Sequence, residues 1–172
     1  MESRCFDSEI DTNPGQSNLT ELRSQFPDYL SQIYWIENTL LKTLPDWNKV
    51  IHSNSLNKAL SEYHLTVAEQ VYQLEHIFEL MKLKAQAKIC KEMTNFLKSD
   101  INLHDNFSSE INRDLYFISK LIDIVSVKMH FYQGVVDTAK ALKLQSVYEW
   151  LLQNLANETH AGHTFLNFKR SN

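Results

Sequence analysis

The chain has 172 residues, a formal net charge of −4 and a sequence pI near 6.0. This length suits one domain with a substantial core and is short for two, and the mild acidity excludes the basic surface by which proteins bind nucleic acid. Only three Gly and three Pro occur, and no Pro follows Pro45, which excludes a turn-rich β fold and predicts an all-α one.

The sequence carries no signal for a membrane or for secretion. No stretch approaches ~18 uninterrupted apolar residues, and the polar N-terminus lacks the apolar core of a signal peptide. We therefore expect a cytoplasmic protein without membrane contact. The two cysteines, Cys5 and Cys90, have no zinc-binding spacing, and Cys90 is predicted to be a small buried hydrophobe.

The first predicted helix follows a polar lead-in. Residues 1–17 mix Asp, Ser, Asn, Pro and Gly without periodicity and are predicted to be flexible, which leaves 18–172 for the helical bundle. Ser17 or Asn18 is a suitable N-cap, Pro27 is expected to bend the helix, and Pro45 to end it near Leu44 or to start a short turn. The apolar stripe of this helix contains Leu22, Phe26, Tyr29, Ile33, Leu40 and Leu44.

Three more long helices and one short helix are predicted further along the chain. The second long helix runs from a cap at 53–55 to about residue 81, and a short helical stretch covers about 85–97. After a polar connection at 99–109, the third long helix covers about 110–142, and the last begins near residue 145 and runs toward 168. Four long helices with brief connections predict a four-helix bundle with an additional short helix.

The apolar stripes differ in whether they contain an ionisable residue. The third long helix has an unbroken apolar seam, consisting of Ile111, Leu115, Ile118, Ile122, Val125, Met129, Tyr132, Val136 and Ala139. In the other three long helices the same spacing includes ionisable residues, namely Glu37 in the first, His64 and Glu75 in the second, and Glu158 in the last. A carboxylate in a core stripe is costly unless it is paired, hydrogen-bonded or bound to a metal.

Glu37, His64, Glu75 and Glu158 are therefore the candidate metal ligands. The chain contains no Glu-x-x-His pair of the kind that ferritin-like bundles use for a dinuclear site. His64 and Glu75 are eleven residues apart, roughly 16 Å along a helix at ~1.5 Å per residue, so they cannot share one metal. The alternative is that each Glu reaches solvent or pairs with a Lys or Tyr, and that His64 is hydrogen-bonded in the core.

Sequence motifs for other chemistry are missing. The chain has no Gly-rich phosphate loop, no GxSxG elbow and no HExxH motif, so no catalytic or cofactor-binding residues are predicted. Trp35 and Trp47 leave open a helical adaptor with an exposed apolar patch around one of them.

The order of these features resembles the bacterial YciE/YciF family of ferritin-like proteins, which is associated with stress responses. The resemblance is carried by IYWIENTLLKTLP (33–45), ALSEYHLTVAEQVYQLEHIFEL (59–80), KAQAKICKEM (84–93), YQGVVDTAKAL (132–142) and LANETHAG (155–162). It implies a ferritin-like bundle, often a homodimer, that holds a metal pair. Within it Glu37 corresponds to the first-helix acid, His64 to the second-helix histidine and Glu158 to the last-helix acid.

The chain departs from the family pattern where further ligands are expected. The third helix of the family carries an acid-His-x-acid cluster ahead of the tyrosine that aligns with Tyr132, and here residues 125–128 read Val-Ser-Val-Lys. Ser99 stands where the short arm of the family offers an acid. Lys128 brings a positive charge to a place that should attract a cation. The metal centre is therefore predicted to be incomplete.

Two functions follow from this interpretation. The first is a non-catalytic bundle without a cofactor, acting in a stress-related role as a homodimer or through an unknown protein partner. The alternative is an iron or manganese oxidase or storage protein that retains a reduced site around Glu37, His64 and Glu158.

Overall fold

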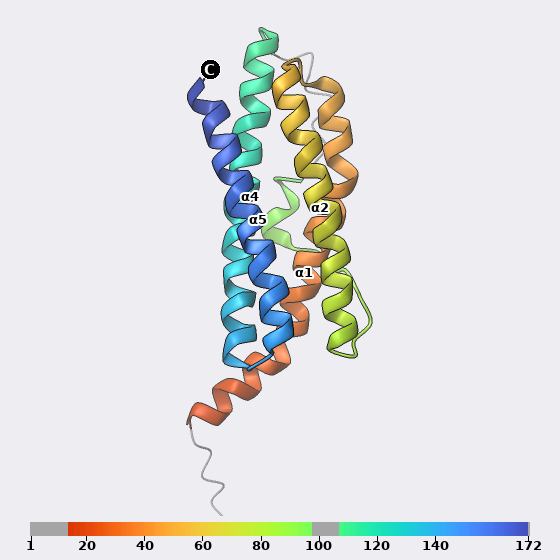
Figure 1. The fold of residues 1–172 in the computed structure, drawn as a ribbon, viewed down its shortest axis with the longest axis vertical. Coiled ribbons are helices and arrows are strands. Elements are labelled where there is room, and N and C mark those ends of the chain that lie inside the picture. Colours follow the sequence, from red (N-terminus) through yellow and green to blue (C-terminus); the bar gives the residue numbers. More distant parts are fainter. Residues whose placement is uncertain (1–13, 98–106, 172) are drawn as a thin grey trace, which may run out of the picture.

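The computed structural model describes residues 14–97 and 107–171 and consists of helices and connections, with no strand in those two ranges. Four long helices, α1 (Pro14–Val50), α2 (Asn54–Leu80), α4 (Glu110–Ala141) and α5 (Gln145–Ser171), form an elongated bundle, and α3 (Lys91–Thr94) is a single turn (Figure 1). This confirms the predicted all-α, ferritin-like four-helix bundle with an additional short helix.

The helices form a square in which each long helix has two neighbours. α1 packs against α2 and α4, and α5 packs against the same two helices. Figure 1 shows that α2 and α4 run in one direction and α1 and α5 in the other. Because α2 and α4 are parallel, the connection between them must return along the bundle, as in other ferritin-like folds with one long crossover.

Several helix boundaries differ from the prediction. α1 begins at Pro14, so Ser17 and Asn18 lie inside the helix and do not cap it, and α1 continues through Pro45 to Val50. The expected helix at 85–97 is confined to α3. The lead-in before residue 14 and Ser99 lie outside the described residues, and a bundle boundary at residue 18 stays a prediction.

The predicted cap of α2 is confirmed, and α4 begins with a cap of the same kind. The Ser53 side chain accepts a hydrogen bond from the backbone N–H of Leu56, and Ser109 accepts one from that of Asn112. Each hydroxyl satisfies an N–H group that the first helical turn leaves without a partner. None of the described helices is long and apolar enough to cross a membrane.

The hydrophobic core is divided into an upper and a lower cluster. The upper cluster includes Leu40, Trp47 and Phe117, and the lower one includes Phe26 and Phe78. Trp47 is fully buried and Trp35 is partly buried against the upper cluster, so the structure contradicts an exposed patch around Trp47. Cys90 is buried as predicted.

The seam of α4 is only partly as predicted. Val125 and Tyr132 are buried and Met129 is partly buried, whereas the Ile111 side chain is 65% exposed. Lys128, which the apolar seam left out, is fully enclosed and lies between the two clusters. The inner face of α4 therefore does carry a charge, which the apolar seam by itself did not indicate but which the comparison with the family placed at Lys128.

Candidate functional site: a buried polar layer

A layer of polar side chains from all four long helices separates the upper and lower clusters. At its centre the ammonium of Lys128 on α4 lies 2.8 Å from Glu158 Oε1 on α5 and 2.8 Å from Glu37 Oε2 on α1. The contact with Glu158 is a hydrogen bond, whereas the contact with Glu37 is a close ion pair whose angle does not suit a hydrogen bond. One cation thus bridges two carboxylates.

Tyrosine and glutamine side chains complete the layer. Tyr63 on α2 accepts a hydrogen bond from Lys128 Nζ (3.0 Å) and donates its own to Glu158 Oε2 (3.1 Å). Gln70, two turns further along α2, donates to Glu158 Oε1 (2.8 Å). Tyr132 on α4 donates to Glu37 Oε1 (2.8 Å). Both carboxylates therefore receive neutral donors in addition to the ammonium.

Helical spacing explains why these residues meet. Lys128 lies three residues after Val125 and four before Tyr132, and both of these are buried, so all three share the inner face of α4. Tyr63 and Gln70 are separated by seven residues, or about two turns, and face the same side of α2. The long aliphatic stem of Lys128 carries its charge to the middle of the bundle.

Burial controls the protonation of the layer. Glu37 and Glu158 are fully buried, and Lys128 is 1% exposed. Burial, with a smaller contribution from Glu158, raises the pKa of Glu37 to about 7 against the opposing effect of Lys128. Burial also lowers the pKa of Lys128, but the two carboxylates outweigh it and hold that pKa well above its usual value. Lys128 is therefore positively charged at neutral pH.

The tyrosines of the layer remain neutral. Burial is the main cause that raises the pKa of both Tyr63 and Tyr132 well above the usual value, and the neighbouring carboxylates add to it. Each phenol therefore keeps its proton and serves as a hydrogen-bond donor, Tyr63 to Glu158 and Tyr132 to Glu37.

Of the four candidate ligands, the structure brings together Glu37 and Glu158 but not the other two. His64 is half-buried on α2, and its Nε2 lies 3.0 Å from the backbone carbonyl of Leu41 on α1. Pro45 has no N–H to donate to that carbonyl, so His64 supplies the hydrogen bond that the proline removes from α1. This contact shows how α1 passes through Pro45 without ending.

Glu75 lies on the outside of α2. Its side chain is exposed and accepts a hydrogen bond from the Tyr34 hydroxyl of α1 at 2.7 Å. Burial and this carboxylate raise the pKa of Tyr34. Within residues 14–97 and 107–171, no three His, Cys, Asp or Glu side chains are grouped so that they could hold a metal ion.

Reasoning from the sequence missed two members of the layer, Tyr63 and Gln70. Tyr63 directly precedes His64 on α2, and of the two only the tyrosine points into the bundle. Gln70 stands three residues after Val67 and four before Leu74, a spacing that already places it on the apolar stripe of α2. The apolar stripe of α2 therefore indicates a buried amide at residue 70 as well as buried apolar residues.

Comparison with known proteins agrees with this architecture. Residues 21–170 match a family described as a domain of unknown function, DUF892. The chain belongs to this family. The match covers nearly all of the described residues and bears out the expected YciE/YciF-like membership. None of the curated proteins compared with the chain matches it.

Two solved structures share the fold of this DUF892 protein. The E. coli stress protein YciF has a TM-score of 0.80 and 16% sequence identity, over 86% of this chain and 94% of YciF. YcfI of Rhodopseudomonas palustris has a TM-score of 0.79 and 17% identity, over 94% of this chain and 97% of YcfI. At these identities the likeness shows a shared fold.

Proposed function

We propose that this DUF892 protein is a non-catalytic ferritin-like bundle with a stress-related role, in which the ammonium of Lys128 takes the place of a metal centre. The observation that carries this proposal is the position of Lys128 Nζ, 2.8 Å from both Glu37 and Glu158. A metal ion bound by the same two carboxylates would have to occupy the position that the ammonium fills.

The donor set around the ammonium does not fit a dinuclear iron or manganese site. Besides the two carboxylates, the side chains in contact with Lys128 are the Tyr63 hydroxyl and the Gln70 amide, and neither carries a charge. Ferritin-like metal pairs use four carboxylates and two histidines. Two carboxylates carry at most two negative charges, so one ammonium leaves less unbalanced buried charge than two divalent ions would.

Burial supports a role outside catalysis. Glu37 and Glu158 are fully buried and Lys128 is 1% exposed, so the layer offers no surface to a substrate. The stress-related part of the proposal rests on the fold shared with the stress protein YciF. A bundle with a sealed polar layer acts through its outer surface, by binding another macromolecule or another copy of itself.

Metal titration tests the proposal directly. The melting temperature of protein purified without a His-tag should stay within experimental error when Fe²⁺ or Mn²⁺ is added, because the ammonium already satisfies both carboxylates. Elemental analysis of the same protein should find metal well below one ion per chain. The matched variants are Glu37→Gln, which alters the layer, and Glu75→Gln, which alters an exposed acid outside it.

The alternative of a metal-dependent oxidase or storage protein predicts a different result. It predicts tight stoichiometric metal binding that raises the melting temperature by several degrees, an increase that Glu37→Gln removes and Glu75→Gln preserves. Such a result would require Lys128 to leave the layer and would overturn the proposal. A rise that both variants keep would come from metal bound elsewhere on the surface.

A further inference from the structure

Tyr132 is a buried phenol whose hydroxyl proton points at a carboxylate. Its side chain is fully buried in the lower cluster, and its hydroxyl donates a hydrogen bond of 2.8 Å to Glu37 Oε1 on α1. Hydrogen bonds to an ionised acceptor are shorter and stronger than those between neutral groups. The phenol and a base that can take its proton are therefore in direct contact inside the bundle.

This contact matters for electron transfer. A neutral phenol that loses one electron becomes a strong acid, so its oxidation near neutral pH is easy only where a base takes the proton at the same time. Glu37 Oε1 lies within the distance over which a proton passes along a hydrogen bond. The products of such a step are a neutral phenoxyl radical at Tyr132 and a protonated Glu37, and neither brings a new charge into the interior.

The charge balance of the polar layer favours the same step. Two carboxylates, Glu37 and Glu158, face the single ammonium of Lys128, so the layer carries one net negative charge when both acids are ionised. Removing one electron from the layer cancels that charge. Because an uncompensated charge is costly in a protein interior, the loss of an electron relieves a cost that the reduced layer carries.

The second phenol of the layer, Tyr63, is placed less favourably for this chemistry. Its hydroxyl donates to Glu158 Oε2 at 3.1 Å, but it also accepts a hydrogen bond from Lys128 Nζ at 3.0 Å. The same ammonium lies over the Tyr63 ring, 5.1 Å from its centroid. A positive charge over an aromatic ring stabilises the electrons of the ring, so Tyr63 gives up an electron less readily than Tyr132.

We infer that Tyr132 is a redox-active tyrosine, which gives one electron to a one-electron oxidant in solution while its hydroxyl proton moves to Glu37. The O–H bond of Tyr132 breaks, an O–H bond forms on Glu37 Oε1, and the oxidant is reduced by one electron. The oxidant stays outside the bundle, because a helix is only about 10–12 Å across and an electron can tunnel over that distance. The sealed layer shields the radical from water and from other radicals. This activity goes beyond the proposed function, since it gives the layer a role in holding one oxidising equivalent.

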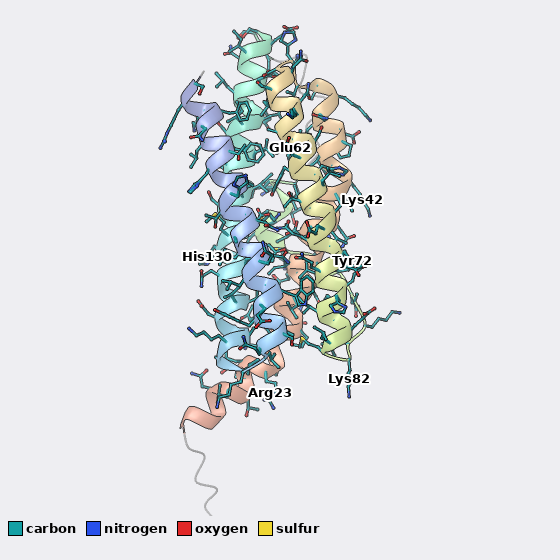
Figure 2. All side chains as sticks on the ribbon, in the orientation of Figure 1. Arg23, Lys42, Glu62, Tyr72, Lys82 and His130 are labelled. Carbon is teal, nitrogen blue, oxygen red and sulfur yellow. The ribbon has the colours of Figure 1, made fainter. Side chains whose placement is uncertain are left out.

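Flash oxidation of the metal-free, full-length protein tests the inference. Light with persulfate converts tris(bipyridine)ruthenium(II) into its ruthenium(III) form, a strong one-electron oxidant, and electron paramagnetic resonance then identifies any tyrosyl radical. Wild type should give a tyrosyl radical that outlasts those of exposed tyrosines, and Tyr132→Phe should lose it. Tyr72→Phe is the matched control, because Tyr72 is 67% exposed on the outside of α2 (Figure 2), and it should keep the long-lived radical. A radical that survives Tyr132→Phe and disappears in Tyr63→Phe would overturn the inference.

Glu37→Gln separates the proton acceptor from the phenol. Gln has nearly the same shape as Glu but cannot take up the proton, so the long-lived radical should be lost although every tyrosine is still present. Circular dichroism of the same samples distinguishes this loss from unfolding. A wild type without a long-lived tyrosyl radical, or a folded Glu37→Gln variant that keeps it, would refute the inference. Protein that forms no such radical and ignores added metal would leave the proposed Lys128 centre standing.

Discussion

Replacing Lys128 by Met removes the ammonium from the polar layer and keeps a side chain of similar length. The volume of the site changes little, so lost packing should cost less than about 1.5 kcal/mol. The main effect is that Glu37 and Glu158 are left buried without a cation. Breaking a buried ion pair by removing one partner generally costs about 3–5 kcal/mol.

The pH dependence of this loss can be worked from the structure. Without the ammonium, a carboxyl of the layer must hold a proton at neutral pH or remain as an unpaired buried charge, and Glu37 has a pKa of about 7 even with Lys128 beside it. Holding a buried carboxyl protonated costs about 1.4 kcal/mol for each pH unit above the value near 4.3 of an unfolded Glu. Lys128→Met should therefore destabilise the fold by roughly 4 kcal/mol at pH 7.5 and by about 1.5 kcal/mol at pH 5.5.

Urea denaturation followed by circular dichroism at both pH values measures the two losses. Lys140→Met is the matched control, because Lys140 is an exposed lysine of the same helix, and its effect should stay within about 0.5 kcal/mol. Should Lys128→Met fail to fold, adding Glu37→Gln and Glu158→Gln should restore folding by removing the unpaired charges. A loss below about 1 kcal/mol at pH 7.5, or an equal loss at both pH values, would refute the reasoning.

Three further predictions concern single contacts. The raised pKa of Glu37 means that the folded state binds a proton more tightly than the unfolded one, so wild-type stability should fall as pH rises from about 4.5 to about 7. Glu37→Gln should flatten that slope and be at least as stable as wild type at pH 8, and an unchanged slope in urea titrations would contradict the assignment. His64→Phe should lower the free energy of unfolding by about 1 kcal/mol, because it leaves the Leu41 carbonyl without its hydrogen-bond donor. The loss should be clearly smaller in a Pro45→Ala background, where the N–H of residue 45 can donate to that carbonyl. Equal losses in this double-mutant cycle would disprove the link between His64 and Pro45. Met129→Ala should lower the free energy of unfolding by about 1–3 kcal/mol, which is less than for a fully buried Met because the Met129 side chain is only partly buried. A loss below about 0.5 kcal/mol would mean that Met129 does not pack on the core.

The sequence by itself determined the helical architecture. Apolar residues repeat with helical spacing over most of the chain, breakers are scarce, and Ser53 and Ser109 stand where caps are needed, so the four long helices follow from local rules. The stripes also identified Glu37 and Glu158 as inward-facing acids, and both are fully buried. Such patterns are readable because they depend on residues within the same helix.

The tertiary structure decided what those acids meet. Lys128 and Met129 both fit the alternating steps of three and four residues along α4, and periodicity cannot tell which of them faces the centre. The rotation of α4 is set by packing against α1 and α5, and it turns Lys128 inward and leaves Met129 partly exposed. The bridge from Lys128 to Glu37 and Glu158 joins three helices far apart in the sequence. The same holds for His64, whose partner is a carbonyl freed by Pro45 on another helix, a relation that only the packing of α1 against α2 creates.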